Sequence, residues 1–356
     1  MKQIYDIAVI GAGPAGAVFA KELSALCPSL SIALIDGQTE NKKKVCGGLL
    51  APDAQKILAK LDLTLPKDVL SDPQIFDVET IDLASGCVRH YQRHYLNMDR
   101  YAFDRWLVSL VPKTVDVINA HCTDISKDSE HFSLNLKTDT ERVTLSASAI
   151  VGADGANSIV RRTFFNNKIK KYVSIQQHFK CSSLQLPPYS CIFDKETSDS
   201  CSWTIRKDDT FVFGGAFDIN GSRDAFEKQK KRLEKFLGAQ FGEPIKTEAC
   251  LLSSPRRYRD FLTGNGNAFL IGEAAGFISA SSFEGLSSAM LSGKLLADAF
   301  SKAKNIHKAQ RIYKKSAFTL KLKLYFKTFK RMILCSALLR TLIMKSGIAR
   351  VKKYSR

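Results

Sequence analysis

The sequence lacks the features that define several common classes of protein. Its nine cysteines are odd in number and contain no Cys-x-x-Cys pair, which argues against a disulfide framework, a zinc site and a dithiol reductase. The six histidines form no metal-ligand pattern, so no metal is expected. The chain also has no run of about 20 apolar residues, the length that a membrane-spanning helix needs. An apolar strand pattern starts at residue 4, so no cleavable signal is expected, and a reducing cytoplasm fits best.

Acidic residues are absent from the C-terminal part of the chain. Residues 299–356 contain 17 Lys and Arg and no Asp or Glu. Removing these 17 from the 53 basic residues of the whole chain leaves 36 basic against 35 acidic residues in 1–298. The net charge of +18 therefore belongs almost entirely to the C-terminal segment, and only this segment suggests an anionic partner surface.

The remaining pattern predicts an α/β protein. An apolar β-prone run at 4–10, a helix at 14–26 and a second strand at 31–35 form a βαβ unit. No flexible linker follows, which favours a second domain inserted into the first. We expect a Rossmann-like first domain made of residues 1–71, 97–165 and 259–300. An antiparallel-sheet substrate domain is expected at 72–96 and 166–258, and a basic helical segment at 301–356.

A glycine-rich turn lies between the first predicted strand and helix. The motif GAGPAG is followed 20 residues later by Asp36, at the end of the next strand. In such a unit the first glycine permits a tight turn, the second lets a pyrophosphate approach and the third allows close helix packing. The motif predicts a dinucleotide site, although glycines can also serve a turn alone, and it does not separate NAD from FAD. The site residues are Gly11, Gly13, Pro14, Ala15, Gly16 and Asp36.

Two later motifs give a family resemblance. The stretch VGADGANSIVRR (151–162) resembles the Asp-Gly motif of flavoproteins with the p-hydroxybenzoate-hydroxylase-type fold, and LIGEAAGF (270–277) with EGLSSAM (284–290) resembles their third motif. The resemblance implies bound FAD, with an acid on the ribityl chain and a glycine-led helix start facing the flavin ring. The positions that match are Asp154, Gly272, Glu273, Gly285 and Leu286. From the residues alone, Asp154 is equally well a helix cap.

Two further stretches resemble the geranylgeranyl reductase family, and the whole-length pattern is similar to bacterial CbrA-type flavoproteins. These stretches are KVCGGLLAPDA (44–54) and NMDRYAFDRWL (97–107). The resemblance implies cofactor contacts from Cys46, Gly47, Gly48 and Arg100. Cys46 has either a catalytic or gating role, or it packs as a small apolar residue.

One tryptophan lies in a motif that suggests a residue lining the substrate site. SWTIRK (202–207) is similar to the Tyr-x-Trp-x-Phe-Pro signature of the same family, but only Trp203 matches it. Trp203 either faces the substrate or is a core aromatic residue. The family resemblance implies an FAD-dependent oxidoreductase that reduces C=C bonds of a prenyl or other apolar lipid-like substrate; the alternatives are a flavin-dependent monooxygenase and a flavin-bound protein without lipid substrate. No second dinucleotide motif is present, so NAD(P)H, if used, is a transient electron donor.

The basic segment 301–356 allows three interpretations. Its apolar residues recur at helical spacing, with lysines grouped on another side. The helices could pack on the protein body and expose their lysines, or lie on an anionic membrane at its inner face. Nucleic acid is the least favoured partner, because no recognised binding module is present.

Overall fold

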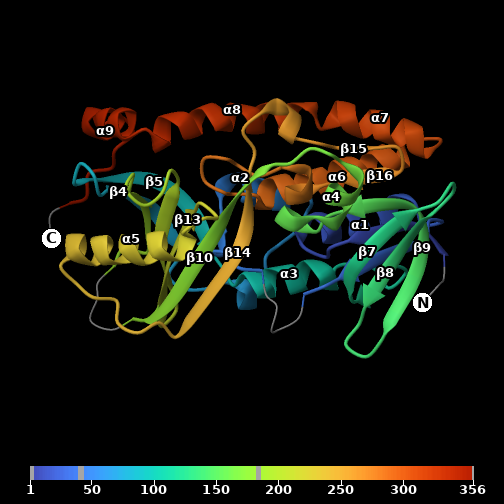
Figure 1. The fold of residues 1–356 in the computed structure, drawn as a ribbon, viewed down its shortest axis with the longest axis horizontal. Helices are drawn as coiled ribbons and strands as arrows, with labels where there is room; N and C mark the ends of the chain where they lie inside the picture. Colours follow the sequence, from blue (N-terminus) through green and yellow to red (C-terminus); the bar gives the residue numbers. More distant parts are fainter. Residues whose placement is uncertain (1–3, 39–43, 182–185, 355–356) are drawn as a thin grey trace. The chain divides into compact units, whose positions relative to one another are not determined.

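The computed structural model describes residues 4–38, 44–181 and 186–354. It has the expected α/β fold, with two sheets and helices packed on them (Figure 1). The chain divides into two compact units. The first consists of 1–43, 101–170 and 253–326, and the second of 44–100, 171–252 and 327–356.

These bounds differ from the expected domain bounds by a few residues at 97–100, 166–170 and 253–258, and by longer segments in two places. Residues 44–71 were expected in the Rossmann-like domain, but they cluster with the second unit. The C-terminal segment does not form a separate body, because the division between the units falls after Phe326, inside a helix.

The first unit is built on a mostly parallel sheet. Its strands are β1 (Ile4–Ile10), β2 (Ile32–Asp36), β6 (Asp116–Asn119), β7 (His121–Lys127), β8 (Phe132–Lys137), β9 (Arg142–Gly152), β15 (Gly264–Asn265) and β16 (Ala268–Leu270). The strand order is β15-β16-β9-β1-β2-β6, and the β7–β8 hairpin extends from β9. The pairs along β16, β9, β1, β2 and β6 are parallel. Their carboxyl ends therefore meet at one edge of the sheet.

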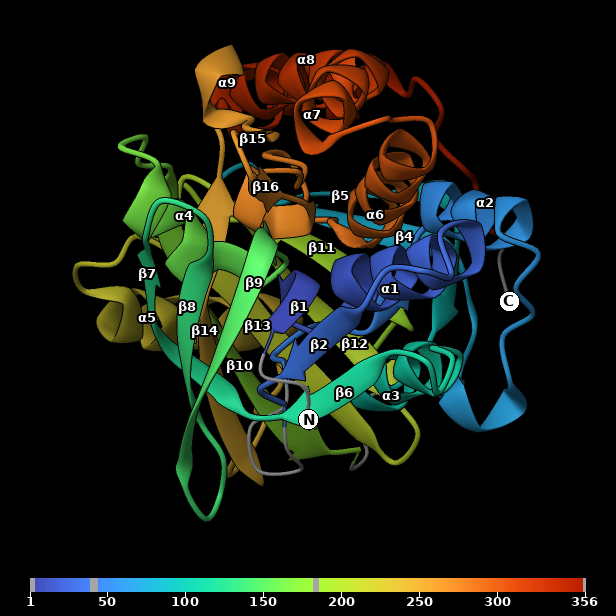
Figure 2. The same cartoon turned by 90° about the vertical axis from the view of Figure 1, so that its right-hand side faces the viewer.

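Helices pack closely on this sheet. They are α1 (Pro14–Leu26), α3 (Arg100–Ser109), α4 (Ile159–Phe164), α6 (Leu286–Ser301), α7 (Ile306–Ser316) and the first half of α8 (Phe318–Cys335). Figure 2 shows α1 beside α6. A Cβ at Gly293 of α6 would lie 2.5 Å from Ala15 O, so the two helix backbones nearly touch. Phe19 and Leu23 of α1 are fully buried in the core under them.

The second unit is a largely antiparallel sheet. Its strands are β3 (Leu49–Leu50), β4 (Ile75–Asp82), β5 (Cys87–Asn97), β10 (Lys170–Lys180), β11 (Tyr189–Phe193), β12 (Cys201–Lys207), β13 (Thr210–Phe217) and β14 (Lys246–Ser254), in the order β14-β10-β13-β12-β11-β4-β5-β3. Its helices are α2 (Pro52–Lys60), α5 (Ser222–Leu237), the second half of α8 and α9 (Ala337–Ser346). Because side chains alternate along a strand, one sheet face packs on α5, and the side chains of the other face contact different parts of the chain. The α5 face carries a phenylalanine cluster: Phe179, Phe211, Phe213, Phe217, Phe226 and Phe241.

The C-terminal segment forms three helices in the described residues, α7, α8 and α9. Within the part of the chain that the structure describes, none of the helices is long and apolar enough to cross a membrane.

Candidate functional site

Turns after three neighbouring strands meet at the carboxyl edge of the first unit's sheet. Ala153 N, after β9, donates a hydrogen bond of 2.8 Å to Ile10 O at the end of β1. Ile271 N, after β16, donates in the same way to Gly152 O at 3.0 Å. All three predicted motifs of this unit are thus brought together at the edge where ligands of open parallel sheets bind.

The three glycines of the GAGPAG turn face different surroundings. Gly11 has φ +104°, and a Cβ there would lie 2.6 Å from Ala153 O. A Cβ at Gly16 would overlap Gly11 O, so both positions require glycine for the turn and for packing. A Cβ at Gly13 would meet no atom of the described residues within 4 Å, although the backbone there has an ordinary φ of −67°. The described part of the chain thus gives no packing reason for glycine at position 13.

The start of α1 leaves its N–H groups available. Gly13 is the N-cap and provides no side chain, and Pro14 occupies the first helical position, followed by Ala15. A helix N-terminus without a side-chain cap carries partial positive charge and unpaired donors, which suits an anion.

Asp36 lies at the end of β2 with its side chain fully buried. Its Oδ1 accepts a hydrogen bond from Gln38 N at 3.0 Å, and its Oδ2 is 2.6 Å from Nη1 of Arg105 on α3. Gln38 also donates to Asp104 Oδ2 at 3.1 Å. The sequence predicted Asp36 but not its ion pair with Arg105, because nothing in the local pattern indicates that α3 packs beside β2.

Asp154 fills the capping role, one of the two that the sequence left open. Its Oδ2 accepts a hydrogen bond of 2.6 Å from Ile159 N at the start of α4, which is the capping role. Its Oδ1 is buried and has no hydrogen-bond partner among the described residues. Burial raises the pKa of Asp154, although hydrogen bonds to the carboxylate oppose this shift. One oxygen thus stays available for a donor supplied from outside the protein.

Glu273 lies in a short 3₁₀ helix (Gly272–Ala275) that follows β16. Its Oε1 accepts a hydrogen bond of 2.8 Å from Ser253 N, so part of its function is structural. Gly272 has φ +58°, and a Cβ there would lie 2.9 Å from Ala15 Cβ. This contact places the third motif directly on the first turn of α1. Gly285 and Leu286 form the N-cap and the first residue of α6, again without a side-chain cap.

Arg161 supports this turn and was not predicted. It is 7% exposed, and its guanidinium donates to Ala274 O and to Asp260 O, each at 2.9 Å. Burial lowers the pKa of Arg161 to about 10, so it remains charged at neutral pH. The arginine pair that ends VGADGANSIVRR was the available signal, but the carbonyls at 260 and 274 lie far away in the sequence.

In the second unit, the Cys46-Gly47-Gly48 segment packs on β12. Gly48 N lies 3.4 Å from Cys46 Sγ, and a Cβ at Gly47 would lie 2.7 Å from Ile205 Cδ1 and 3.8 Å from Trp203 Nε1. Trp203 Nε1 is buried without a hydrogen-bond partner among the described residues. The structure thus brings Cys46 and Trp203 into one cluster, on the sheet face opposite to α5.

Lys207 fixes the Cys46–Gly48 segment through hydrogen bonds, a role that the sequence did not indicate. It follows Ile205 on the same strand face, and its Nζ donates to Asn97 Oδ1 and Met98 O at 2.7 Å and to Gly48 O at 3.3 Å. Gly48 has φ +64°, and a Cβ there would overlap both Met98 O and Lys207 Nζ. Arg100, the first residue of α3, also belongs to the second unit. The predicted cofactor residues are therefore divided between the two units.

Comparisons with solved structures define the class of protein: the chain has the fold of flavin-dependent oxidoreductases. A geranylgeranyl bacteriochlorophyll reductase-like protein from Thermoplasma acidophilum superposes with a TM-score of 0.79 at 17% identity, covering 96% of this chain and 91% of that one. A variant of HpxO from Klebsiella pneumoniae, complexed with FAD, gives 0.68 at 16% identity, over 96% and 94% of the two chains. The flavin-dependent brominase Bmp2 gives 0.68 at 18%, over 96% and 92%.

Sequence comparison identifies the family within this class. The chain is 42% identical over 353 residues to protein CbrA from Escherichia coli, covering 98% of this chain and 94% of the relative. CbrA from Shigella dysenteriae matches at the same identity over 98% of both chains. The chain belongs to the CbrA family. No family model matches it.

The buried ammonium of Lys207 predicts a pH-dependent stability. Burial lowers the pKa of Lys207 to about 8, below its value in the unfolded chain, so the unfolded state binds more protons between pH 8 and 10.5. Relative to Lys207→Met, the free energy of unfolding of the wild type should therefore rise by about 2.5 kcal/mol from pH 7 to pH 10. Urea denaturation at several pH values measures this difference. The exposed Lys235 on α5 provides the control, since Lys235→Met should show no such trend.

Proposed function

We propose that the chain is an FAD-dependent oxidoreductase whose cofactor pyrophosphate binds at the Gly11–Gly16 turn. The observation that carries this proposal is the open space at Gly13, in front of the uncapped start of α1. The glycine has no packing reason within the protein, but a close backbone approach by a pyrophosphate explains it. The FAD seen in the HpxO neighbour and the flavin-dependent function of Bmp2 support the same cofactor.

The other residues of the edge fit the remaining parts of FAD. Asp154 Oδ1 is a buried acceptor without a protein donor, which suits a ligand hydroxyl. Glu273 lies beside it in the third motif and keeps its backbone partner Ser253. The uncapped N-terminus of α6 at Gly285 and Leu286 offers N–H donors to an electron-rich ring edge. Asp36, neutralised by Arg105, provides the acid at the end of β2.

For the reaction, we propose the reduction of a C=C bond in a prenyl or other apolar lipid-like substrate. When bound, FAD supplies the hydride transfer, and the protein positions the apolar substrate. Cys46 and Trp203 are the proposed wall of the substrate site, because they form one cluster on the sheet face not used by α5. Lys207 positions this cluster through the carbonyls of Gly48 and Met98. NAD(P)H is the proposed transient electron donor.

A flavin-dependent monooxygenase is the second candidate, because the p-nitrophenol 4-monooxygenase from Pseudomonas putida shares the fold with a TM-score of 0.71 at 14% identity. The two reactions differ in what consumes the reduced flavin. Anaerobic reduction, followed by mixing with either a prenyl substrate or oxygen plus an aromatic compound, distinguishes them. We expect rapid flavin reoxidation by the prenyl substrate, with mass spectrometry showing a product heavier by two hydrogens. A long-lived peroxyflavin and an oxygenated product would instead support the monooxygenase.

The space at Gly13 predicts a separation of folding from cofactor binding. In Gly13→Ala the methyl group meets no atom of the residues that the structure describes, so the free energy of unfolding of the apoprotein should stay within about 1 kcal/mol of the wild type. The same methyl group blocks the pyrophosphate, so FAD affinity should fall at least about tenfold. Fluorescence titration with FAD measures the loss. Gly16→Ala is the matched control, because its methyl group overlaps Gly11 O and should lower stability as well. Wild-type FAD affinity in Gly13→Ala would contradict the proposal.

Substitutions of Glu273 should distinguish a contact to FAD from a purely structural role of this side chain. Glu273→Asp should keep FAD binding, whereas Glu273→Ala should weaken it, because a polar contact to the ribityl chain is lost. The alanine variant also loses the acceptor for Ser253 N, so the melting temperature of the apoprotein is measured in parallel. An alanine variant with lowered melting temperature and unchanged FAD affinity would show that this acid is only a structural cap.

A further inference from the structure

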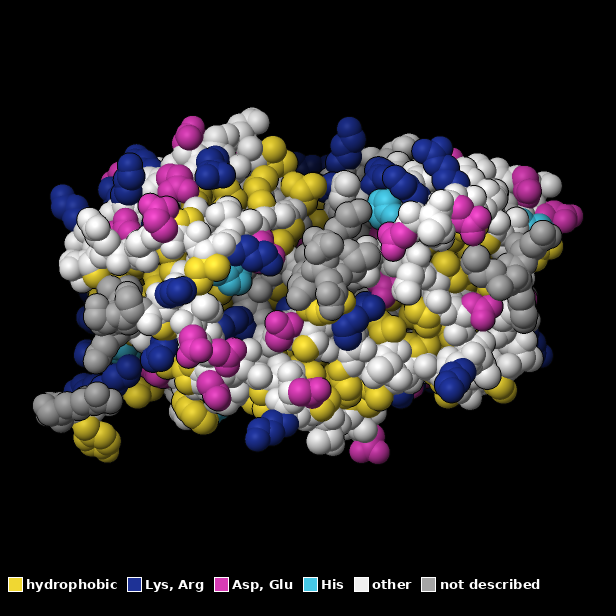
Figure 3. Space-filling model, turned by 90° about the horizontal axis from the view of Figure 1, so that it is seen from below, with side chains coloured by type: hydrophobic (Ala, Val, Ile, Leu, Met, Phe, Trp, Pro, Cys, Tyr) yellow, Lys and Arg dark blue, Asp and Glu magenta, His cyan; other side chains and the backbone are white. Residues whose placement is uncertain are grey.

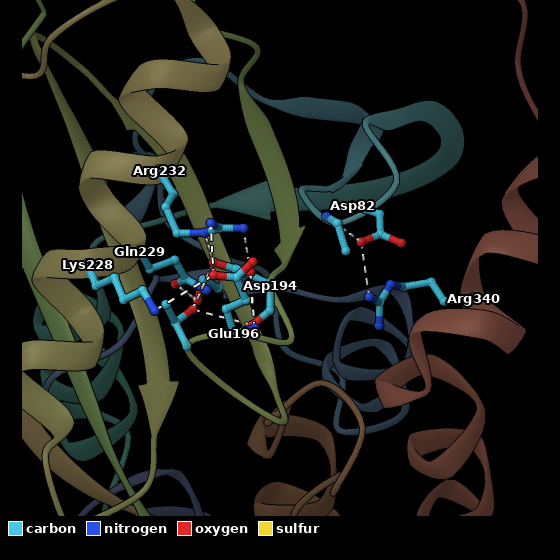
Figure 4. A network of polar contacts seen from close by, with 10 residues as sticks. Asp82, Asp194, Glu196, Lys228, Gln229, Arg232 and Arg340 are labelled. Atoms are coloured by element: carbon cyan, nitrogen blue, oxygen red, sulfur yellow. Dashed lines mark hydrogen bonds and ion pairs between the residues drawn. The ribbon is translucent and has the colours of Figure 1, made fainter.

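The last part of the chain is fixed to the second unit by buried arginines, together with the buried Met344. Arg340 of α9 is 3% exposed, and its Nη2 donates to Asp82 Oδ1 at 3.1 Å (Figure 4). Its guanidinium also lies 4.7 Å from the centre of the Phe193 ring. One helix earlier, Arg331 Nη2 donates to Asp199 Oδ2 at 2.7 Å and to Tyr172 OH at 3.0 Å. Both arginines thus point toward the unit, where Asp82 of β4 and Asp199 of the loop before β12 pair with them.

Further polar contacts hold the same segment. Thr341 Oγ1 donates to Asp82 Oδ2 at 3.2 Å, so one carboxylate binds two residues of α9. Arg89 Nε donates to Met344 O at 2.9 Å, near the end of the helix. Beyond the helix, Val351 N donates to His90 O at 2.8 Å on β5. The segment is therefore held in one orientation on the unit.

This orientation leaves an apolar face exposed. Large apolar side chains occur here in adjacent pairs that recur at helical spacing, on the side opposite to the inward arginines. Met332, Leu338 and Ile348 are 66%, 71% and 70% exposed. We call this surface the tail face; it consists of Met332, Ile333, Leu338, Leu339, Leu342, Ile343 and Ile348. An amphipathic helix of a globular protein normally buries its apolar stripe, so the polarity here is reversed. The segment packs on the second unit and exposes lysines, but it exposes these large apolar side chains as well.

The segment that carries the tail face has charges of a single sign. Lys330, Lys345 and Lys352 are exposed on it, and no acidic residue occurs after position 298. The acids of the unit that contact the segment are paired with its other cations: Asp77 with Lys353, Asp82 with Arg340 and Asp199 with Arg331. The protein face drawn in Figure 3, by contrast, carries acidic and basic side chains interspersed. Exposed apolar residues on a segment whose own charges are all cationic match the two components of an anionic bilayer surface, its headgroups and its acyl boundary.

We propose that the tail face lies in the plane of an anionic phospholipid bilayer. Leu338, Leu342 and Ile348 enter the acyl boundary while the flanking lysines contact the headgroups. Because Arg331 and Arg340 already fix the helices on the folded unit, little conformational entropy is lost on binding. A second copy of the chain is a poorer occupant, because pairing two tail faces brings lysines of like charge together. The inference does not depend on the proposed reaction.

Vesicle binding by the full-length protein tests the proposal. The probes are vesicles of phosphatidylcholine alone and vesicles with about 30 mol% phosphatidylglycerol, with cosedimentation as the readout. We expect binding to the anionic vesicles to be at least about tenfold tighter than to the neutral ones, and to weaken as salt rises from about 0.1 M to about 0.5 M. Equal binding to both kinds of vesicle, or to neither, would overturn the proposal.

A pair of substitutions tests the face itself. Leu338→Ser with Leu342→Ser removes two exposed apolar side chains one helical turn apart and should weaken anionic-vesicle binding at least about tenfold. Ile219→Ser with Ile245→Ser is the matched control, because these residues of the same unit are 51% and 56% exposed and lie outside the tail face. Unchanged melting temperature shows that both variants fold. If the tail-face variant binds like the wild type, or if light scattering shows a wild-type dimer that this variant dissociates, the membrane inference is wrong.

Discussion

The first unit depends on a close approach between α1 and the carboxyl edge of its parallel sheet. Gly11, Gly16 and Gly272 lack side chains at the points where the first turn of α1 meets the turns after β9 and β16. Each added methyl group would overlap a backbone or side-chain atom at these contacts. The approach brings an uncapped helix start, a buried acceptor at Asp154 and the Glu273 turn to one edge.

The second unit relies on buried polar anchors as well as its phenylalanine cluster. Lys207 connects the Gly48 turn to the start of α3 through carbonyl oxygens, and Arg340 connects α9 to Asp82. Removing one partner of such a buried set leaves a charge without compensation, which costs more than a surface contact. These anchors decide where two functional candidates lie, namely the Cys46–Trp203 cluster and the tail face.

The reductase proposal and the membrane inference are physically compatible but rest on different atoms. An apolar substrate of low solubility is most concentrated in a bilayer, so an enzyme held at that surface meets it more often. The reductase proposal rests on the sheet edge and on the cluster at β12. The membrane inference rests on the inward direction of Arg331 and Arg340 and on the charge of the segment that carries them.

The sequence alone determined the features that short-range patterns encode. The first βαβ unit, the GAGPAG turn and Asp36 follow from the spacing of residues within one unit, and the structure has them. Asp154 and the helix start at Gly285 were indicated by the family resemblance. The partners of Arg105, Arg161 and Lys207 lie far away in the chain, so no local pattern predicts them. The direction of the tail was decided only by tertiary packing. Helical spacing shows that a polar and an apolar side exist, but a buried acid at Asp82 and an exposed acid at Asp199, both distant in sequence, bind the two arginines that face the second unit.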